Sequence, residues 1–239
     1  MRLSIVAKIE YYKLLTRFNI IFLSAFILII AFQVLINVRL DTGLERNPDV
    51  PYMNIYNSAD RYVYNLIFTV IPLMYLINLS REFENYIVHR FLVSGLSRKD
   101  YFMGKIMQAI YFSVIGAIMV GAFKLLVSGV YNIPLRIDIT RLLVAAAVAF
   151  YLCCFFGMIV YFVQKTTYSI LFFVAYIILE GIVIAYLRNK GFSVYLPFNT
   201  AVEFLRKNGY EGIQLIALFL FFSGALFTSW WRFRKCDLY

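Results

Sequence analysis

Histidine, proline and charge are all scarce in this sequence. Its 239 residues include one histidine, His89, and five prolines, and only 15% of its side chains are charged. A zinc site built on histidines, or a Ser-His-Asp triad, therefore has too few parts. Soluble globular domains carry about 25% charged residues, so the low share here also argues against a soluble protein.

Cysteines and phosphate-binding motifs are equally sparse. The three cysteines are Cys153, Cys154 and Cys236, and their spacing fits neither a disulfide framework nor zinc ligands. The loop G-x-x-x-x-G-K-[ST] is absent, so the chain is not expected to hydrolyse ATP itself. We therefore expect no metal site, no cofactor bound by this chain and no enzymatic activity. An enzyme of unfamiliar chemistry is the open alternative.

Apolar residues are abundant and fall in long runs. Hydrophobic side chains make up 62% of the sequence, more than a soluble core of this size could enclose. A helix needs about 20 apolar residues to cross a bilayer. Six stretches approach or exceed that length, namely residues 18–38, 62–79, 106–130, 142–163, 168–187 and 213–231. We predict an all-α integral membrane protein with six transmembrane helices in one domain over residues 1–239.

The formal net charge of +10 comes from short basic clusters between the apolar runs. No basic tract or face is present, so we expect a lipid bilayer and not nucleic acid as the partner. An even number of spans places both termini on one side, and 13 of the 23 Lys and Arg fall in the segments of that side. The positive-inside rule then predicts a multi-pass protein with both termini cytoplasmic. The bias is modest, and the opposite orientation stays open.

Residues 1–17 have an amphipathic pattern. Ile5, Ile9 and Tyr12 fall on one side of a helix, and Glu10 and Lys13 fall on another. A helix of this kind can lie in the membrane interface, so we predict an amphipathic, interfacial N-terminal helix. A basic tail that only fixes the topology is the alternative.

The connection after the second predicted span is the most informative segment. Residues 80–105 read SREFENYIVHRFLVSGLSRKDYFMGK. Two acids come first, an amphipathic stretch follows over residues 86–92, and a Ser-Gly pair at 94–95 interrupts it. Ser97, with Asp100 three residues later, resembles a capping box and predicts the start of a new helix. A polar loop that faces water is the simpler interpretation of the same residues.

This layout resembles that of the membrane subunits of type-2 ABC exporters, the ABC-2 permease family. In that family six spans follow an amphipathic start, and Glu occurs near the beginning of the first cytoplasmic connection. A small-residue break then precedes the third helix, which often has a lysine at its start. Glu82, Glu84, the residues around Gly95, and Lys105 stand at the corresponding places here.

The resemblance implies a permease subunit of an ATP-driven exporter in a bacterial cytoplasmic (inner) membrane. Its partners would be a separate ABC ATPase subunit, which binds the ATP and Mg²⁺, and a second permease chain, identical or related. Residues 80–105 would be the cytoplasmic coupling segment, and residues 81–96 within it would dock on the ATPase. The candidate coupling residues are Arg81, Glu82, Glu84, Tyr86, His89, Arg90, Phe91, Ser94 and Gly95.

Two charged residues lie inside the predicted spans. Glu180 is near the middle of the fifth span, and Lys124 is toward the outer end of the third. A charge at the centre of a bilayer costs about 2.5–3.5 kcal/mol on insertion scales, so we expect Glu180 to have a partner. Lys124 is the natural candidate, although it could instead extend to the outer headgroups.

The resemblance also assigns a role to the segment between the last two spans. In the family this connection re-enters the outer leaflet as short helices, so residues 188–212 would form an outer re-entrant segment. Pro197 and Glu203 are then the candidates for an outer gate. An ordinary extracellular loop is the alternative.

Two other functions fit a bundle of six helices. A non-transport membrane scaffold, or an accessory subunit of an envelope or secretion complex, is the main alternative to an exporter. A half-transporter driven by an ion gradient would need more intramembrane charges than Glu180 and Lys124 provide.

Overall fold

The computed structural model describes residues 17–42, 52–135, 138–187, 196–198, 201 and 212–235. Within these ranges the chain forms helices and no strand, so the all-α prediction is confirmed for them. The helices are α2 (Arg17–Thr42), α3 (Tyr52–Glu84), α4 (Ile87–Val93), α5 (Arg98–Tyr131), α6 (Ile139–Val163), α7 (Thr166–Leu187) and α9 (Gly212–Lys235).

Six of these helices are long and apolar enough to cross a membrane, which confirms the predicted number. The spans are Asn19–Asn37, Ser58–Glu84, Arg98–Tyr131, Ile139–Val163, Thr166–Tyr186 and Ile216–Lys235. Helices α3 and α5 are longer than predicted, with 33 and 34 residues. At 1.5 Å per residue each is about 50 Å long, whereas a hydrocarbon core is about 30 Å thick. The ends of both helices therefore extend into the headgroup region or beyond it.

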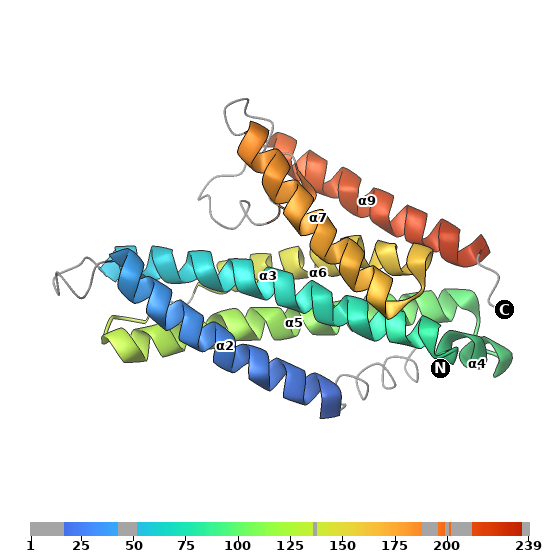
Figure 1. Ribbon diagram of the computed structural model, residues 1–239, viewed down its shortest axis with the longest axis horizontal. Helices are drawn as coiled ribbons and strands as arrows, with labels where there is room; N and C mark the ends of the chain where they lie inside the picture. Colours follow the sequence, from blue (N-terminus) through green and yellow to red (C-terminus); the bar gives the residue numbers. More distant parts are fainter. Residues whose placement is uncertain are drawn as a thin grey trace.

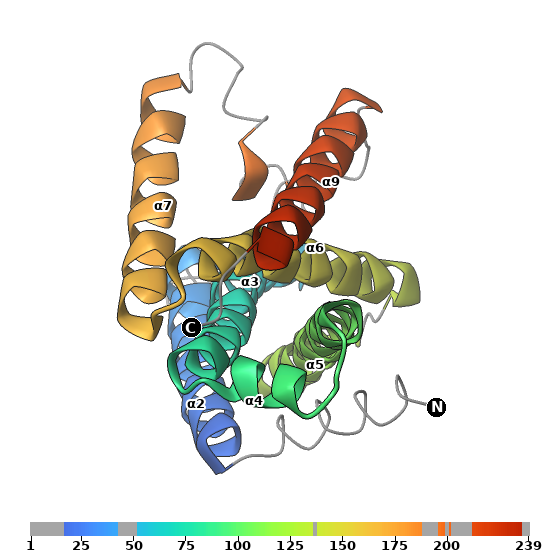
Figure 2. The same ribbon diagram turned by 90° about the vertical axis from the view of Figure 1, so that its right-hand side faces the viewer.

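Helices α3, α5 and α6 pack on one another and form the centre of the bundle (Figure 1). Helix α2 lies along α3, α7 packs against α3 and α6, and α9 packs mainly against α6. Figure 2 shows α7 and α9 on one side of α6 and α5 on the other. Buried residues make up 76% of the most apolar window of α3, but only 13% in α2 and 17% in α7 and α9. The peripheral helices thus expose apolar faces, as expected of surfaces that meet lipid.

Small residues allow close packing at two places in the centre. A methyl group added at Gly157 of α6 would lie 2.7 Å from Cε1 of Tyr75, because the ring of Tyr75 fills the space that glycine leaves. At Gly116 of α5 the corresponding position is 3.4 Å from Ile71 and 3.6 Å from Ala149, which is ordinary contact. Close approach over small residues is the usual way in which membrane helices associate.

A sharp corner separates α3 from α5 and contains the short helix α4. Tyr86 enters α4 in a left-handed conformation with φ of 56°, and Gly95 follows α4 with φ of 91°. The N-terminus of α5 is as predicted: Ser97 Oγ accepts a hydrogen bond from the Asp100 N–H at 3.1 Å and donates one to Asp100 Oδ2 at 2.7 Å. Helix α4 and the C-terminal end of α9 lie at the same end of the bundle (Figure 1), which we call the α4 end.

Some of the predicted features fall outside the described residues. Residues 1–16 of the predicted interfacial helix are among them, as are Glu203 and most of the predicted re-entrant segment 188–212. Both segments stay predictions.

Candidate functional site

A buried ion pair joins α3 to α5 at the α4 end. Lys105 Nζ donates to Glu82 Oε1 at 2.6 Å, and the two side chains are 1% and 5% exposed. Glu82 lies in the last turn of α3, and Lys105 lies two turns into α5. An ion pair enclosed in this way is stable only when further hydrogen bonds satisfy its remaining donors and acceptors.

Three neighbouring side chains surround the pair. The Tyr101 hydroxyl donates to Glu82 Oε2 at 2.7 Å, and the Lys105 ammonium lies 5.0 Å from the centroid of the Tyr101 ring. Gln108 Oε1 accepts from Lys105 Nζ at 3.4 Å. The Tyr75 hydroxyl donates to the backbone carbonyl of Lys105 at 3.2 Å. These contacts fix the relative position of α3 and α5 close to the corner that holds α4.

Helix α4 has one face buried against this cluster and one face open. Val88 is 1% exposed, and the ring centroid of Phe91 lies 6.4 Å from that of Tyr101. Tyr86 and Val93 are 62% and 74% exposed. A short chain of contacts therefore leads from α4 through Phe91 and Tyr101 to the carboxylate of Glu82.

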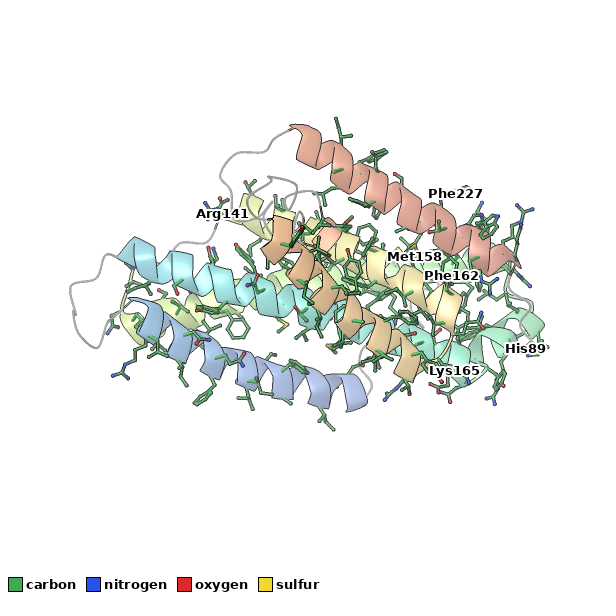
Figure 3. The ribbon with its side chains drawn as sticks, turned by 45° about the horizontal axis from the view of Figure 1, so that its top comes forward. His89, Arg141, Met158, Phe162, Lys165 and Phe227 are labelled. Carbon is green, nitrogen blue, oxygen red and sulfur yellow. The ribbon has the colours of Figure 1, made fainter. Side chains whose placement is uncertain are left out.

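The nine candidate coupling residues differ in exposure. Glu82 is buried and Phe91 is half-buried against the core. Its carboxylate faces inward because Lys105 and Tyr101 supply the hydrogen bonds that a buried charge needs. The other seven are exposed, namely Arg81, Glu84, Tyr86, His89, Arg90, Ser94 and Gly95. Figure 3 shows His89 at this end of the molecule.

Two further contacts bind the other helices to this end. Glu84 Oε2 accepts a hydrogen bond from the backbone N–H of Thr166 at 3.3 Å, so an acid of α3 lies at the N-terminus of α7, where negative charge is favourable. Arg98 Nη1 donates to the carbonyls of Phe233 and Arg234 at 3.0 and 2.6 Å. The first residue of α5 thus satisfies free carbonyls at the C-terminus of α9.

A second charged cluster joins the same two helices at the far end. Lys124 Nζ of α5 lies 3.2 Å from Asp60 Oδ1 of α3, and Arg141 Nη1 of α6 lies 3.9 Å from Asp60 Oδ2. The expected pairing of Lys124 with Glu180 is therefore wrong, because α5 packs against α3 while Glu180 lies on α7. The sequence did not reveal Asp60 as the partner of Lys124, because Asp60 precedes the second apolar run and was therefore expected to lie in a loop.

The two clusters are separated by about the thickness of a membrane. Asp60 and Glu82 are 22 positions apart in α3, and Lys105 and Lys124 are 19 apart in α5. At 1.5 Å per residue these separations are about 33 Å and 29 Å, close to the 30 Å of a hydrocarbon core. Both pairs can therefore lie near the edges of the hydrocarbon, where a charge costs less than at its centre.

Glu180 has partners other than lysine. Its side chain is hydrogen-bonded with the side chain of Tyr176, and its Oε2 accepts from the backbone N–H of Phe198 at 3.4 Å. Pro197 is buried, and its carbonyl accepts from the Tyr151 hydroxyl at 3.5 Å. Residues 196–198 therefore pack against α6 and α7. Whether Pro197 belongs to a gate stays a prediction.

An apolar cavity of about 300 Å³ lies between α6 and α9. Its lining consists of Ala147, Val148, Phe150, Tyr151, Leu218, Phe219 and Phe222. With no charged residue in this lining, the cavity suits an apolar group and offers nothing to hold an ion.

Among the residues that the structure describes, no group of three or more His, Cys, Asp or Glu could hold a metal ion. No family model matches the chain. A search of curated proteins finds no matching relative.

Proposed function

We propose that this chain is the membrane-spanning permease subunit of an ATP-driven ABC exporter and that it docks a separate ATPase subunit through α4. The observation that carries the proposal is the placement of α4. It is a short helix with an exposed face at one end of a six-helix bundle. Its other face places Phe91 against Tyr101, which is hydrogen-bonded to a buried ion pair between two central helices.

The exposed face of α4 has the composition of a docking surface. Tyr86 and Val93 offer apolar area, and His89 and Arg90 offer hydrogen-bond donors. Aromatic residues and arginine are enriched where proteins bind one another. Tyr86 and Gly95 lie on either side of α4 in left-handed conformations and hold this short helix against the bundle. A loop that only faced water would not need them.

The ion pair gives a route by which a docked partner acts on the membrane helices. A force on α4 reaches Tyr101 through Phe91, and Tyr101 is bonded to Glu82. Because Glu82 and Lys105 hold α3 to α5, the two helices would move together and not slide past each other. ATP binding and hydrolysis by the partner would supply the energy, and a second permease chain would complete the pathway.

The proposal places the α4 end in the cytoplasm of a bacterial cell, with the chain in the cytoplasmic membrane. The positive-inside rule supports this orientation, since most Lys and Arg belong to segments on that side. An ATPase needs cytoplasmic ATP, so the docking face and the basic side must coincide. Cysteine accessibility in intact cells, with cysteine introduced at Ser94, tests the orientation.

The test of function is purification of the tagged chain from its native membranes, with and without nucleotide. An ABC ATPase is expected to co-purify, and the double variant Tyr86→Ala/Val93→Ser is expected to lose it. The variant Tyr186→Ala/Val130→Ser removes the same side-chain types from exposed positions outside the α4 face, and it should retain the ATPase.

Two results would reject the proposal. If the wild-type chain never binds an ATPase under either condition, it is not an ABC permease. If an ATPase binds but the reconstituted complex moves no cargo and the cells lose no export on deletion, the chain is a scaffold or accessory subunit.

A further inference from the structure

The apolar cavity between α6 and α9 lies where these two helices diverge. Figure 1 and Figure 2 show α9 close to α6 at the α4 end and farther from it toward the N-terminus of α9. At the close end the Thr228 hydroxyl donates to Met158 Sδ at 2.9 Å, and the ring centroids of Phe233 and Tyr161 are 5.6 Å apart. The cavity lies toward the other end, between residues 147–151 of α6 and 218–222 of α9. The two helices are therefore fastened at one end and leave a space at the other.

The described lining of this cavity offers apolar surface to a ligand. Of its seven side chains only that of Tyr151 carries a polar atom, and the Tyr151 hydroxyl already donates to the carbonyl of Pro197 at 3.5 Å. The rings of Phe150 and Phe222, one from each helix, have their centroids 5.6 Å apart. A polar group placed here would lose its hydrogen bonds to water and gain none from these side chains, so the ligand must be apolar.

The depth of the cavity identifies the material that surrounds it. Arg141 of α6 belongs to the charged cluster at the far end, near the edge of the hydrocarbon. Ala147 and Tyr151 follow it by 6 and 10 positions, which places them about 9 and 15 Å deeper at 1.5 Å per residue. Half of a hydrocarbon core is about 15 Å thick. The cavity therefore lies in the far half of this core, where acyl chains and not water or headgroups are found.

The volume of the cavity matches one hydrocarbon chain. A dry protein cavity of about 150 Å³ accommodates benzene, so the space of about 300 Å³ between α6 and α9 has room for about a dozen carbon atoms. A single leucine or phenylalanine side chain from a second copy would fill only part of it, and space left empty between helices is costly. Phe219 belongs to the lining and is 69% exposed, so the cavity opens toward the surrounding lipid.

We propose that this cavity is a binding site for one acyl chain of a phospholipid in the leaflet at the far end. The chain enters beside Phe219 and lies between the Phe150 and Tyr151 side of α6 and the Leu218 and Phe222 side of α9. Its headgroup stays at the membrane surface. A chain held between two helices keeps a fixed place, whereas lipids along the open faces of α2 and α7 exchange freely. This inference does not depend on the exporter proposal.

The test uses the purified full-length chain in lipid nanodiscs that contain a small, increasing share of a photoreactive phospholipid. The probe carries a diazirine in the lower half of one acyl chain, at the depth of the cavity. After illumination, mass spectrometry identifies the labelled residues. We expect labelling of residues 147–151 and 218–222 to saturate as the share of probe rises. At low probe it should exceed the labelling of Phe32, a 67% exposed residue of α2, by about tenfold or more.

Variants that fill the cavity should remove the site. Ala147→Phe adds a ring from the α6 side and should lower the saturable labelling of residues 218–222 about tenfold. Leu218→Trp fills the same space from the α9 side and should lower the labelling of residues 147–151 equally, so the test does not rest on one substitution. The matched control is Ala122→Phe, which adds the same ring at an exposed position of α5 outside the cavity and should keep the labelling. An unchanged elution volume in size-exclusion chromatography shows that each variant is folded.

Four results would overturn the proposal. Labelling that never saturates and spreads evenly over exposed apolar positions would mean ordinary contact with bulk lipid. Equal loss in Ala147→Phe and Ala122→Phe would mean that an added ring disturbs the bundle wherever it is placed. Labelling of the cavity in monomers but not in dimers would mean that a second copy covers it. Displacement of the probe by a free fatty acid at a far lower concentration than by unlabelled phospholipid would mean that the site selects a free amphiphile and not a membrane lipid.

Discussion

The ammonium of Lys105 lies 2.6 Å from the carboxylate of Glu82, and water reaches almost none of either side chain. The two residues are 23 positions apart in sequence and belong to antiparallel helices that leave the membrane at the same end. Tyr101 connects the pair to Phe91 of α4, so the pair is central to the proposed coupling between α4 and the membrane helices.

Removing one member of this pair is expected to destabilise the protein strongly. Lys105→Met should lower the free energy of unfolding by about 3–5 kcal/mol, because it leaves the Glu82 carboxylate buried without its cation. Reversible unfolding in mixed micelles with sodium dodecyl sulfate measures the change. The double variant Glu82→Gln/Lys105→Met should recover most of the loss. A double variant no more stable than Lys105→Met would contradict this account of the pair.

Two buried tyrosines allow a hydrogen bond to a charged acceptor, Glu82, to be compared with a hydrogen bond to a neutral acceptor. Tyr101→Phe removes a donor to a carboxylate and should cost about 1.5–3 kcal/mol of unfolding free energy. Tyr75→Phe removes a donor to the backbone carbonyl of Lys105 and should cost about 0.5–1.5 kcal/mol. The same unfolding assay compares them. The cost of Tyr101→Phe should shrink in a Glu82→Gln background, and equal costs in both backgrounds would mean that Glu82 is not its partner.

The far-end cluster should tolerate the loss of its lysine better. After Lys124→Met, Asp60 still has Arg141 nearby, and the Asp60 side chain is 15% exposed where that of Glu82 is 5%. We expect a smaller loss of unfolding free energy than for Lys105→Met. In the double variant Lys124→Met/Arg141→Met, Asp60 loses both cations, and the loss of unfolding free energy should approach that of Lys105→Met. The expectation fails if Lys124→Met is as damaging as Lys105→Met.

Among the glycines whose surroundings the structure describes, Gly157 should tolerate an added side chain poorly because Tyr75 fills the space beside it. Gly157→Ala places a methyl group against the Tyr75 ring and should cost about 1–3 kcal/mol through overpacking. Gly121→Ala is the control, since its added methyl would lie 4.0 Å from Leu142; it should be neutral or stabilise α5 by up to about 1 kcal/mol. Thermal unfolding in detergent distinguishes the two. Similar melting temperatures for both variants would contradict the packing described.

Gly95 should control the position of α4 through its backbone and not its surroundings. No atom lies within 4 Å of an added methyl group, but φ of 91° is strained for any L-residue. Gly95→Ala should therefore loosen α4, seen as faster hydrogen exchange over residues 87–93. Gly129→Ala, also open but helical, should leave that exchange unchanged. If both variants exchange alike at α4, the left-handed residue has no such role.

The number of spans and the start of α5 could be predicted because both depend on local patterns. An apolar run of about 20 residues has few uses besides crossing a membrane. Ser97 followed by Asp100 satisfies the free amides of a helix start with atoms three residues apart. Neither inference requires knowledge of which helices are neighbours.

The pairing of charges could not be predicted, because it depends on the packing order of the helices. Glu180 and Lys124 were the charges evidently inside apolar runs, so they were matched with each other. In the structure α3 packs against α5, so Lys124 meets Asp60 instead. Asp60 lies in a helix that continues well before its apolar part, and a hydropathy pattern does not show such an extension.

Helix α3 contributes both acids of the two clusters, and helix α5 contributes a lysine to each. The ribosome makes α3 first. Asp60 and Glu82 therefore leave the ribosome before Lys105 and Lys124, and at that moment α3 has acids near both ends that α5 does not yet neutralise. Only when α5 emerges do its two lysines neutralise them together, in the one antiparallel register that aligns both pairs. Because of this order of synthesis, the insertion of α5 fixes α3 in its final position.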